Sequence, residues 1–313
     1  MILTVTPNTA LDVTYRVPRL VPHSTHRVGD VVERPGGKGL NVARVLAALG
    51  HEVTVTGFAG GAAGAAVGAA LRADGPGRAA PLHDALVPVG GTTRRTVAVV
   101  DAATGDTTQF NEPGPQITAA EWDALVAVYR DLLPGVRAVA LCGSLPPGVP
   151  VGAYAALVRL ARTAGVPVLL DTAGEPLRRG IAARPDLVKP NLDELAQLTG
   201  SRDPLPAVRD ARRKGARTVV ASLGPDGMLA ATPEGTWQAR PPRVRGNPTG
   251  AGDSAVAGVL SGLVEGLDWP ATLTRAAALS AATVRAASAG EFDRQTYDEL
   301  RPRVEVSART AGV

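Results

Sequence analysis

The chain has 313 residues, a length that allows one large α/β domain or two smaller ones. Apolar residues make up 45% of the chain and charged residues 20%, which is typical of a folded globular protein and excludes the disordered, fibrous and coiled-coil classes. The formal net charge of +4 comes from dispersed arginines, with no basic run interleaved with aromatic residues. This pattern does not indicate nucleic-acid binding, whereas a modest positive field suits an anionic small substrate.

The single cysteine, Cys142, excludes an internal disulfide framework and a zinc site built on cysteines, and it fits a reducing compartment. The first residues show no basic segment followed by a long apolar stretch, and no uncharged apolar run reaches the roughly 18 residues of a membrane span. We therefore expect a cytoplasmic protein that has neither a nucleic acid nor a membrane as its partner.

Short apolar runs alternate with helical patterns along most of the chain. We expect strands over residues 2–5, 53–56, 136–141, 166–170, 187–188 and 217–222, and helices near 39–49, 62–72, 118–133, 150–164, 192–198, 205–214, 251–263 and 270–287. A hairpin from 228–231 to 236–239 is expected at the edge of the same sheet. This alternation predicts a mainly parallel sheet with helices on both faces, a three-layer αβα sandwich.

Residues 12–34 and 92–111 break this rhythm because polar and apolar side chains alternate in them, as in Thr14-Tyr15-Arg16-Val17. Period-two alternation predicts strands with one face in water, so the two segments are expected to form a small antiparallel sheet apart from the main one. The predicted organisation is an αβα domain of residues 1–11, 35–90 and 112–313, with a β-sheet lid of residues 12–34 and 91–111.

Three glycines surround a lysine in Gly36-Gly37-Lys38-Gly39-Leu40-Asn41, at the start of a predicted helix. Lysine is rare here, with three among 33 basic residues. The segment is not a P-loop, because Gly39 stands where Ser or Thr is required. Lys38 and Asn41 offer a cation and an amide to a polyhydroxylated or phosphorylated compound, while a structural glycine turn is the alternative interpretation.

Other sites are not supported. The glycine-rich turn Gly57-Phe58-Ala59-Gly60-Gly61-Ala62-Ala63-Gly64 fails the dinucleotide pattern at Ala59, and no acidic residue ends a following strand at the right place. The four histidines show no metal-ligand spacing, and Ser144 lacks the glycine two positions earlier that a nucleophile elbow requires, since Cys142 stands there. These features speak against an NAD enzyme, a histidine metal site and a hydrolase.

Two further loops follow predicted strands, where α/β sheets bind ligands. In Lys189-Pro190-Asn191-Leu192-Asp193-Glu194, the side chains of Asn191 and Glu194 lie on one side of a beginning helix and could face a metal-nucleotide. An ordinary capping box is the alternative. The loop Ser222-Leu223-Gly224-Pro225-Asp226-Gly227 could hold phosphate or ribose, although by itself it indicates a turn.

The most specific local pattern is Asn247-Pro248-Thr249-Gly250-Ala251-Gly252-Asp253-Ser254, before a helix of small residues. Gly250 and Gly252 leave backbone N–H groups and the positive end of the helix dipole open to an anion, which suits a transferring phosphoryl group. Asp253 at this position could take a proton from an attacking hydroxyl. A helix N-cap after a glycine turn is the alternative.

Together and in this order, these motifs resemble the ribokinase-type carbohydrate kinase family, in its tagatose-6-phosphate kinase and 1-phosphofructokinase branch. The resemblance covers nearly the whole chain. It rests on Thr6-Pro7-Asn8 with Asp12, Gly36–Asn41, Thr93-Arg94, Gly143-Ser144-Leu145-Pro146-Pro147-Gly148, Lys189-Pro190-Asn191 with Glu194, Ser222-Leu223-Gly224 and Gly250-Ala251-Gly252-Asp253.

The resemblance implies a ribokinase-like αβα fold with a small lid, and a role for each matching residue. Asp253 would be the catalytic base, and Gly250, Ala251 and Gly252 would form the anion hole. Sugar binding would fall to Asp12, Gly37, Lys38, Asn41 and Ser144, and binding of ATP to Lys189, Asn191, Ser222, Gly224 and Gly227. Glu194 would act on Mg²⁺ through water, because Mg²⁺ tends to keep its hydration.

Arg27 and Arg94 match positions where phosphosugar kinases place cations for the phosphate already on the substrate, and with Lys38 they favour a phosphorylated sugar over ribose or a nucleoside. Solvation of the lid surface is the alternative interpretation of these two arginines. Asn247 replaces an aspartate that helps a monovalent-cation site in many members, which puts potassium activation in doubt. The Asn247-Pro248 pair and Gly39-Leu40-Asn41-Val42 look more like tagatose-6-phosphate kinase than 1-phosphofructokinase.

The expected function is ATP-dependent phosphorylation of a ketohexose monophosphate to a bisphosphate in sugar phosphate catabolism. A kinase of an unphosphorylated sugar or nucleoside, and a catalytically silent sensor of sugar phosphate or nucleotide, are the competing hypotheses. Exposed edges of lid sheets can pair between subunits, so a homodimer through the lid is also expected.

Overall fold

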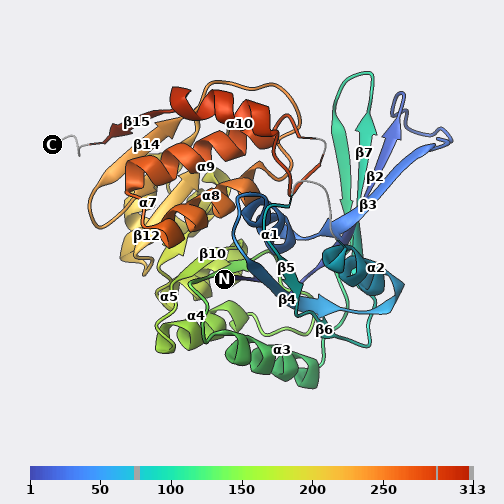
Figure 1. Ribbon diagram of the computed structural model, residues 1–313, viewed down its shortest axis with the longest axis horizontal. Helices are drawn as coiled ribbons and strands as arrows, with labels where there is room; N and C mark the ends of the chain where they lie inside the picture. The colour runs from blue at the N-terminus through green and yellow to red at the C-terminus, as the bar shows by residue number, and fades with distance from the viewer. Residues whose placement is uncertain (74–77, 287, 310–313) are drawn as a thin grey trace.

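A computed structural model describes residues 1–73, 78–286 and 288–309. It has a large twisted sheet covered by helices on both faces, and a small sheet that stands apart from the main body, at the upper right of Figure 1. No helix in these ranges is long and apolar enough to cross a membrane.

The large sheet runs in the order β15-β14-β13-β12-β11-β10-β9-β1-β4-β5, with β6 pairing to β4. Its strands from β12 through β5 are parallel, and β13, β14 and β15 are added antiparallel. The bounds are β1 Ile2–Thr6, β4 Val53–Ala59, β5 Leu82–Asp84, β6 Val87–Pro88, β9 Ala138–Cys142, β10 Val168–Asp171, β11 Leu187–Val188, β12 Thr218–Ser222, β13 Met228–Ala231, β14 Thr236–Arg240 and β15 Glu305–Ala308. β1 and β9 are buried along their whole length; β9 is a continuous apolar run, whereas β1 also contains Thr4 and Thr6.

Helices cover the two faces of this sheet and form two hydrophobic cores with it. One face carries α1 Lys38–Ala48, α2 Gly61–Arg72, α8 Ala251–Glu265, α9 Trp269–Thr283 and α10 Arg294–Leu300; the other carries α3 Ala119–Leu132, α4 Ala153–Thr163, α5 Gly174–Ala182, α6 Leu192–Thr199 and α7 Pro204–Arg213. Capping residues next to the helices determine several helix starts. Thr118 and Glu121 form a reciprocal capping box at α3, and Asp203 caps α7 ahead of a proline in the first turn.

The small sheet has the order β3-β2-β7-β8 and consists of β2 Ala10–Val17, β3 Asp30–Gly36, β7 Arg94–Asp101 and β8 Thr107–Asn111. Its central pair, β2 and β7, is parallel, and the two outer pairs are antiparallel. The two alternating segments of the sequence therefore meet in one separate sheet, as predicted. The expectation of an entirely antiparallel sheet was wrong, because the chain passes through the main body between β2 and β7 and returns in the same direction.

Several elements were not predicted. The short helices α5 and α10 and the edge strand β15 are missing from the sequence-based assignment, and β15, not the hairpin β13–β14, forms the edge of the large sheet. α5 has an apolar face with Leu177 and Ile181, but its two glycines and one proline lower its helix propensity; β15 is short and largely exposed. α9 ends at Thr283, before the predicted end at Ala287, which lies outside the described residues.

Candidate active site

A cleft of about 960 Å³ lies between the carboxyl ends of the large sheet's strands and the small sheet. The loops after β9, β10, β11 and β12 contribute to its wall, as do the starts of α1 and α8. From the small sheet, β2, β7 and β8 add Asp12, Arg94, Thr96, Gln109 and Asn111. This is the edge at which an open α/β sheet binds its ligands.

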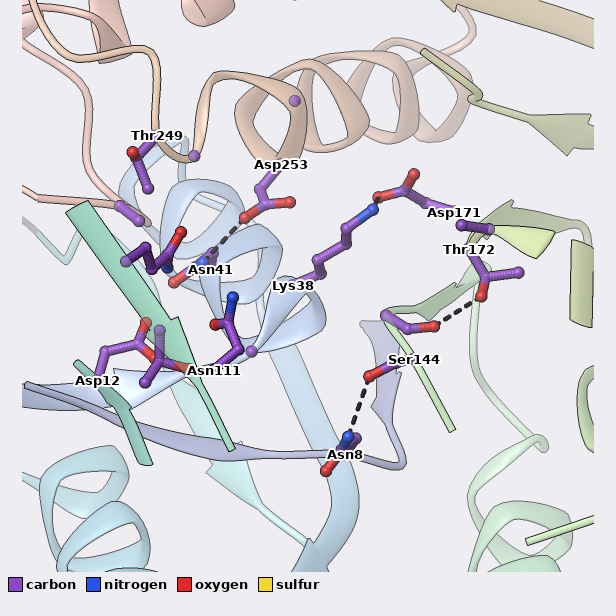
Figure 2. A pocket seen from close by; sticks show the side chains of 18 of the residues that line it. Asn8, Asp12, Lys38, Asn41, Asn111, Ser144, Asp171, Thr172, Thr249 and Asp253 are labelled. Atoms are coloured by element: carbon purple, nitrogen blue, oxygen red, sulfur yellow. Dashed lines mark hydrogen bonds and ion pairs between the residues drawn. The ribbon is translucent and has the colours of Figure 1, made fainter. Parts of the chain in front are cut away.

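Asp253 lies in the first turn of α8, and its carboxylate faces the cleft although it is almost fully buried. The Asn41 side-chain amide donates a hydrogen bond to its Oδ2 at 2.9 Å (Figure 2). Burial raises the pKa of Asp253 to about 6, and the nearby Asp171 carboxylate acts in the same direction, while Lys38, Asn41 and Lys189 oppose the shift. A carboxylate with this pKa can accept a proton near neutral pH.

Asp171 ends β10 and holds two ammonium groups in the cleft. Lys38 Nζ lies 3.4 Å from its Oδ2 and Lys189 Nζ lies 3.6 Å from its Oδ1. Asp171 and Lys189 are nearly inaccessible to solvent, whereas Lys38 is partly exposed and reaches across from α1 (Figure 2). Asp171 raises the pKa of Lys38 above its ordinary value, so Lys38 is fully charged at neutral pH. The two lysines therefore present positive charge beside Asp253.

Gly250 begins α8 in a left-handed conformation, with φ of 84°. A side chain there would also collide with Ala289, whose Cα lies 2.9 Å from an added Cβ, so the turn requires glycine. The N–H of Ala251 donates to Pro248 O at 3.0 Å, which commits it to the turn. The N–H groups of Gly252 and Asp253 make no backbone hydrogen bond within the described ranges, and they are the donors left for an anion.

The small-sheet side of the cleft carries Asp12 and Arg94. Burial raises the pKa of Asp12, against the effect of the Thr96 hydroxyl and of Arg94 and Arg44. Arg94 donates from Nε to Asn8 O at 3.3 Å and from Nη1 to Glu112 O at 3.4 Å. Asn8 in turn donates to the Ser144 hydroxyl at 3.0 Å (Figure 2). Residues of the small sheet are thus tied to the loop after β9, and together with Gly37 they can bind a polar molecule.

On the opposite side, Asn191, Glu194 and Ser222 line the same cleft, and Asn191 forms a parallel bridge with Ser222. Asn191 and Glu194 also make the reciprocal capping box that begins α6, so the capping interpretation of this motif is confirmed. The capping role does not prevent the two side chains from facing the cleft. A neighbouring pocket of about 700 Å³ is lined by Gly224, Gly227 and Ala251, and it shares Asn191, Ser222 and Gly252 with the cleft.

Arg27 is the predicted substrate-binding residue that the structure does not bring to the cleft. It is exposed in the loop between β2 and β3 and is not among the residues that line the cleft. A role for Arg27 in its own chain's site is therefore not supported by this geometry. Both ends of the Asn247 amide make hydrogen bonds: Oδ1 accepts from the Thr249 N–H and hydroxyl, and Nδ2 donates to the hydroxyl of Thr107 on β8 at 3.3 Å.

Sequence reasoning did not assign Asp171, Thr172, Asn8, Gln109, Asn111, Glu112 or Thr249 to the site. For Asp171 a signal exists, because it is the first charged residue after the apolar run 166–170, at a strand's carboxyl end. Gln109 and Asn111 carry no comparable signal, since they are polar residues on a strand that is mostly exposed.

No group of three or more His, Cys, Asp or Glu side chains that could hold a metal occurs in the described part of the chain. Mg²⁺ needs no such cage when phosphates and water supply most of its ligands. Both carboxylate oxygens of Asp171 already face ammonium groups, those of Lys38 and Lys189. Glu194 faces the same cleft, and its carboxylate fits a hydrated Mg²⁺ that arrives with a nucleotide.

The sequence matches the pfkB family of carbohydrate kinases over residues 4–296. A 1-phosphofructokinase of Rhodobacter capsulatus is 39% identical over 286 residues, which cover 89% of this chain and 89% of that protein. Phosphofructokinase-2 of Escherichia coli, solved in a tetrameric inhibited form, has a TM-score of 0.87 at 29% identity and covers 96% of this chain and 98% of that one. A possible 1-phosphofructokinase of Thermotoga maritima has a TM-score of 0.89 at 28% identity, covering 99% and 100%.

A mainly parallel sheet with a small separate sheet, joined at a cleft with a buried carboxylate and a glycine turn at a helix start, is the arrangement of a kinase of the ribokinase-like fold. The chain belongs to the pfkB family of carbohydrate kinases. The fold and family predicted from the sequence motifs are thereby confirmed.

Proposed function

We propose that the protein transfers the γ-phosphoryl group of ATP to a hydroxyl of a ketohexose monophosphate and forms the bisphosphate. The observation that carries this proposal is the buried Asp253, placed at the glycine turn of α8 beside the two lysines that share Asp171. A base, an anion-binding turn and fixed positive charge are the groups that phosphoryl transfer to an alcohol needs.

Fructose 1-phosphate is the first candidate substrate, because the relative that is 39% identical is a 1-phosphofructokinase. Phosphofructokinase-2 of E. coli, 29% identical, has been solved in complex with fructose-6-phosphate, which supports a ketohexose monophosphate in general. Tagatose 6-phosphate, favoured by the Asn247-Pro248 pair, stays the second candidate. The two compounds present related shapes, since a ketofuranose carries similar hydroxymethyl arms on both sides of its ring.

The proposed reaction begins with Asp253 as the ionised base. It accepts the proton of the acceptor hydroxyl as that oxygen forms its bond to the γ-phosphorus, and the bond between this phosphorus and the bridging oxygen of ADP breaks. Asn41 orients the carboxylate through its hydrogen bond to Oδ2. The N–H groups of Gly252 and Asp253, with Lys38 and Lys189, stabilise the negative charge on the transferring group.

The sugar is assigned to Asp12, Gly37, Asn41 and Ser144, and its phosphate to Arg94. The Nη2 of Arg94 makes no hydrogen bond within the described ranges, so the guanidinium has a donor to spare for a phosphate oxygen. Lys38 was predicted at the sugar, but its contact with Asp171 supports a position between the two substrates. Lys38 is therefore proposed to act on the transferring phosphoryl group.

The nucleotide is assigned to Lys189, Asn191 and Ser222 and to the neighbouring pocket at Gly224 and Gly227. Mg²⁺ would be held by Glu194 through water, and when bound it would neutralise charge on the phosphates. A cytoplasmic location and a homodimer through the small sheet remain part of the proposal.

Measurement of ADP release with fructose 1-phosphate, tagatose 6-phosphate, fructose 6-phosphate and unphosphorylated fructose tests the function. We expect the highest kcat/KM with fructose 1-phosphate or tagatose 6-phosphate, and no release above background from Asp253→Asn. Preference for the unphosphorylated sugar would favour a sugar kinase without a phosphate site, and no release with any of the compounds would favour a sensor.

A further inference from the structure

An ion-pair cluster outside the reacting groups joins the small sheet to the main body. Glu291, in the segment after α9, pairs through Oε1 with Arg34 of β3 and with Nη2 of Arg44 of α1, the latter at 2.9 Å. Its second oxygen, Oε2, accepts from the Ser288 hydroxyl at 3.1 Å. One carboxylate thus connects the segment after α9 with β3 and α1, two consecutive elements that lie far earlier in the chain.

Segment 288–291 contacts the starts of both α1 and α8, the two helices that carry Asn41 and Asp253. A Cβ added to Gly290, whose φ is 75°, would lie 2.9 Å from Asn41 Oδ1, and Ala289 packs directly against Gly250. Arg44 Nη1 also donates to Ala289 O at 3.2 Å. The position of this segment is therefore coupled to Asn41, which orients Asp253, and to the glycine turn of α8.

The same cluster reaches the sugar side through β3. Arg34 stands directly opposite Asp12 in the antiparallel pair β2–β3. Asp12, Arg34 and Arg44 together line a small cavity of about 60 Å³ next to the cleft. Burial lowers the pKa of Arg44, and the Glu291 carboxylate acts against this shift, as expected of the counter-charge that keeps the two guanidinium groups together.

We propose that Glu291 is a positioning residue for phosphoryl transfer: by pairing with Arg34 and Arg44 it fixes Asp12 of the small sheet relative to Asn41 and Asp253. This inference rests on the proposed function. Without the carboxylate, Arg34 and Arg44 repel each other, and β3 loses its charged contact with the main body. The sugar site then loosens, while the nucleotide side, which is formed by the loops after β11 and β12, keeps its geometry.

The kinetic constants of Glu291→Gln and Glu291→Ala test the proposal, with the acceptor that the wild type uses best. We expect the KM for the sugar phosphate to rise about tenfold, with the KM for ATP within about twofold of wild type. Glu291→Asp is expected to restore part of the loss, and Arg34→Ala added to Glu291→Ala is expected to add little, because both changes break the same contact.

Asp210→Asn is the matched control, since Asp210 is also a partly exposed carboxylate paired with two cations, Arg213 and Lys214, but it lies on α7, none of whose residues lines the cleft. The control should leave both KM values unchanged. Unchanged constants in both Glu291 variants, or an equal rise in both KM values accompanied by a lower Tm, would overturn the positioning role. A wild type that phosphorylates no ketohexose phosphate would instead refute the proposed function.

Discussion

At the scale of single residues, the fold places the Asp253 carboxylate where its ionised form is unfavourable. The carboxylate is kept from water and lies near a second carboxylate, Asp171, and the two lysines offset these effects only in part, so the pKa rises from 3.8 to about 6. The same burial that makes Asp253 a stronger base thus makes its ionised form unfavourable in the folded chain. Both consequences can be measured.

Turnover should depend on the ionisation of Asp253. Below about pH 6 the carboxylate is protonated and cannot accept the hydroxyl proton, so kcat/KM should fall about tenfold per pH unit on the acidic side. A pH–rate profile with saturating ATP checks this expectation. An acidic limb near pH 4, the ordinary range of an aspartate, would contradict the raised pKa.

Asp253→Asn should remove turnover and stabilise the ligand-free protein at the same time. Because the folded pKa is raised, the folded chain binds more protons than the unfolded chain between pH 3.8 and about 6, so stability falls as the pH rises through this window. Above it, the neutral amide should gain up to about 3 kcal/mol in the free energy of unfolding. Thermal denaturation at pH 4 and pH 8 tests this, and an equal change in Tm at both values would refute it.

At the scale of elements, the first turns of α6 and α8 both begin a helix and contribute residues to the cleft. α6 begins with a capping box, and its Glu194 also faces the cleft. α8 begins with a left-handed glycine that packs on Ala289. The capping role of Glu194 and the turn at Gly250 could each be predicted from local sequence, because caps depend on neighbouring residues. The packing of Gly250 on Ala289 could not, since it joins segments far apart in the chain.

Glu194→Gln should separate capping from metal binding. Glutamine can still accept the hydrogen bond of the capping box, so the Tm should stay close to that of the wild type. A neutral amide attracts hydrated Mg²⁺ less, so the Mg²⁺ concentration for half-maximal activity should rise about tenfold or more. Glu121→Gln in the equivalent box of α3 should change neither quantity. An unchanged Mg²⁺ requirement in Glu194→Gln would assign Glu194 to capping alone.

Gly250→Ala should strain the backbone at position 250 and bring the new Cβ into collision with Ala289. Any side chain in the left-handed region costs about 1–2 kcal/mol, and here the added Cβ also meets Ala289. Gly266→Ala is the matched control, because Gly266 ends the same helix with φ of 72° and nothing lies within 4 Å of its added Cβ. We expect Gly250→Ala to lose more stability in urea denaturation than the control, and to lose activity. Equal losses would show that the Ala289 contact is unimportant.

At the scale of the whole molecule, the small sheet exposes two edge strands that carry apolar side chains. β3 and β8 are its edges, and Val31 and Phe110 on them are 48% and 59% exposed. Exposed edge strands with apolar side chains favour pairing with another chain. A dimer through this sheet would also give the exposed loop with Arg27 an environment that a single chain does not provide.

Val31→Lys should therefore weaken self-association, because a charge on an edge strand opposes pairing. Sedimentation measurements on the wild type should give a dimer or a larger assembly, and the variant should dissociate at a concentration about tenfold higher or more. Glu305→Lys, at an exposed position on the edge strand of the large sheet, is the control and should leave the mass unchanged. A wild type that is monomeric throughout would contradict the proposed assembly.

The sequence by itself determined the alternation of strands and helices, the separate small sheet and the glycine, lysine and aspartate motifs, because these depend on local pattern and turn chemistry. The tertiary structure alone decided which motifs meet. It placed Asp171 between Lys38 and Lys189, left Arg27 outside the cleft, and joined Glu291 to Arg34 and Arg44. These contacts depend on tertiary packing between separate elements, so they cannot be predicted from local sequence patterns.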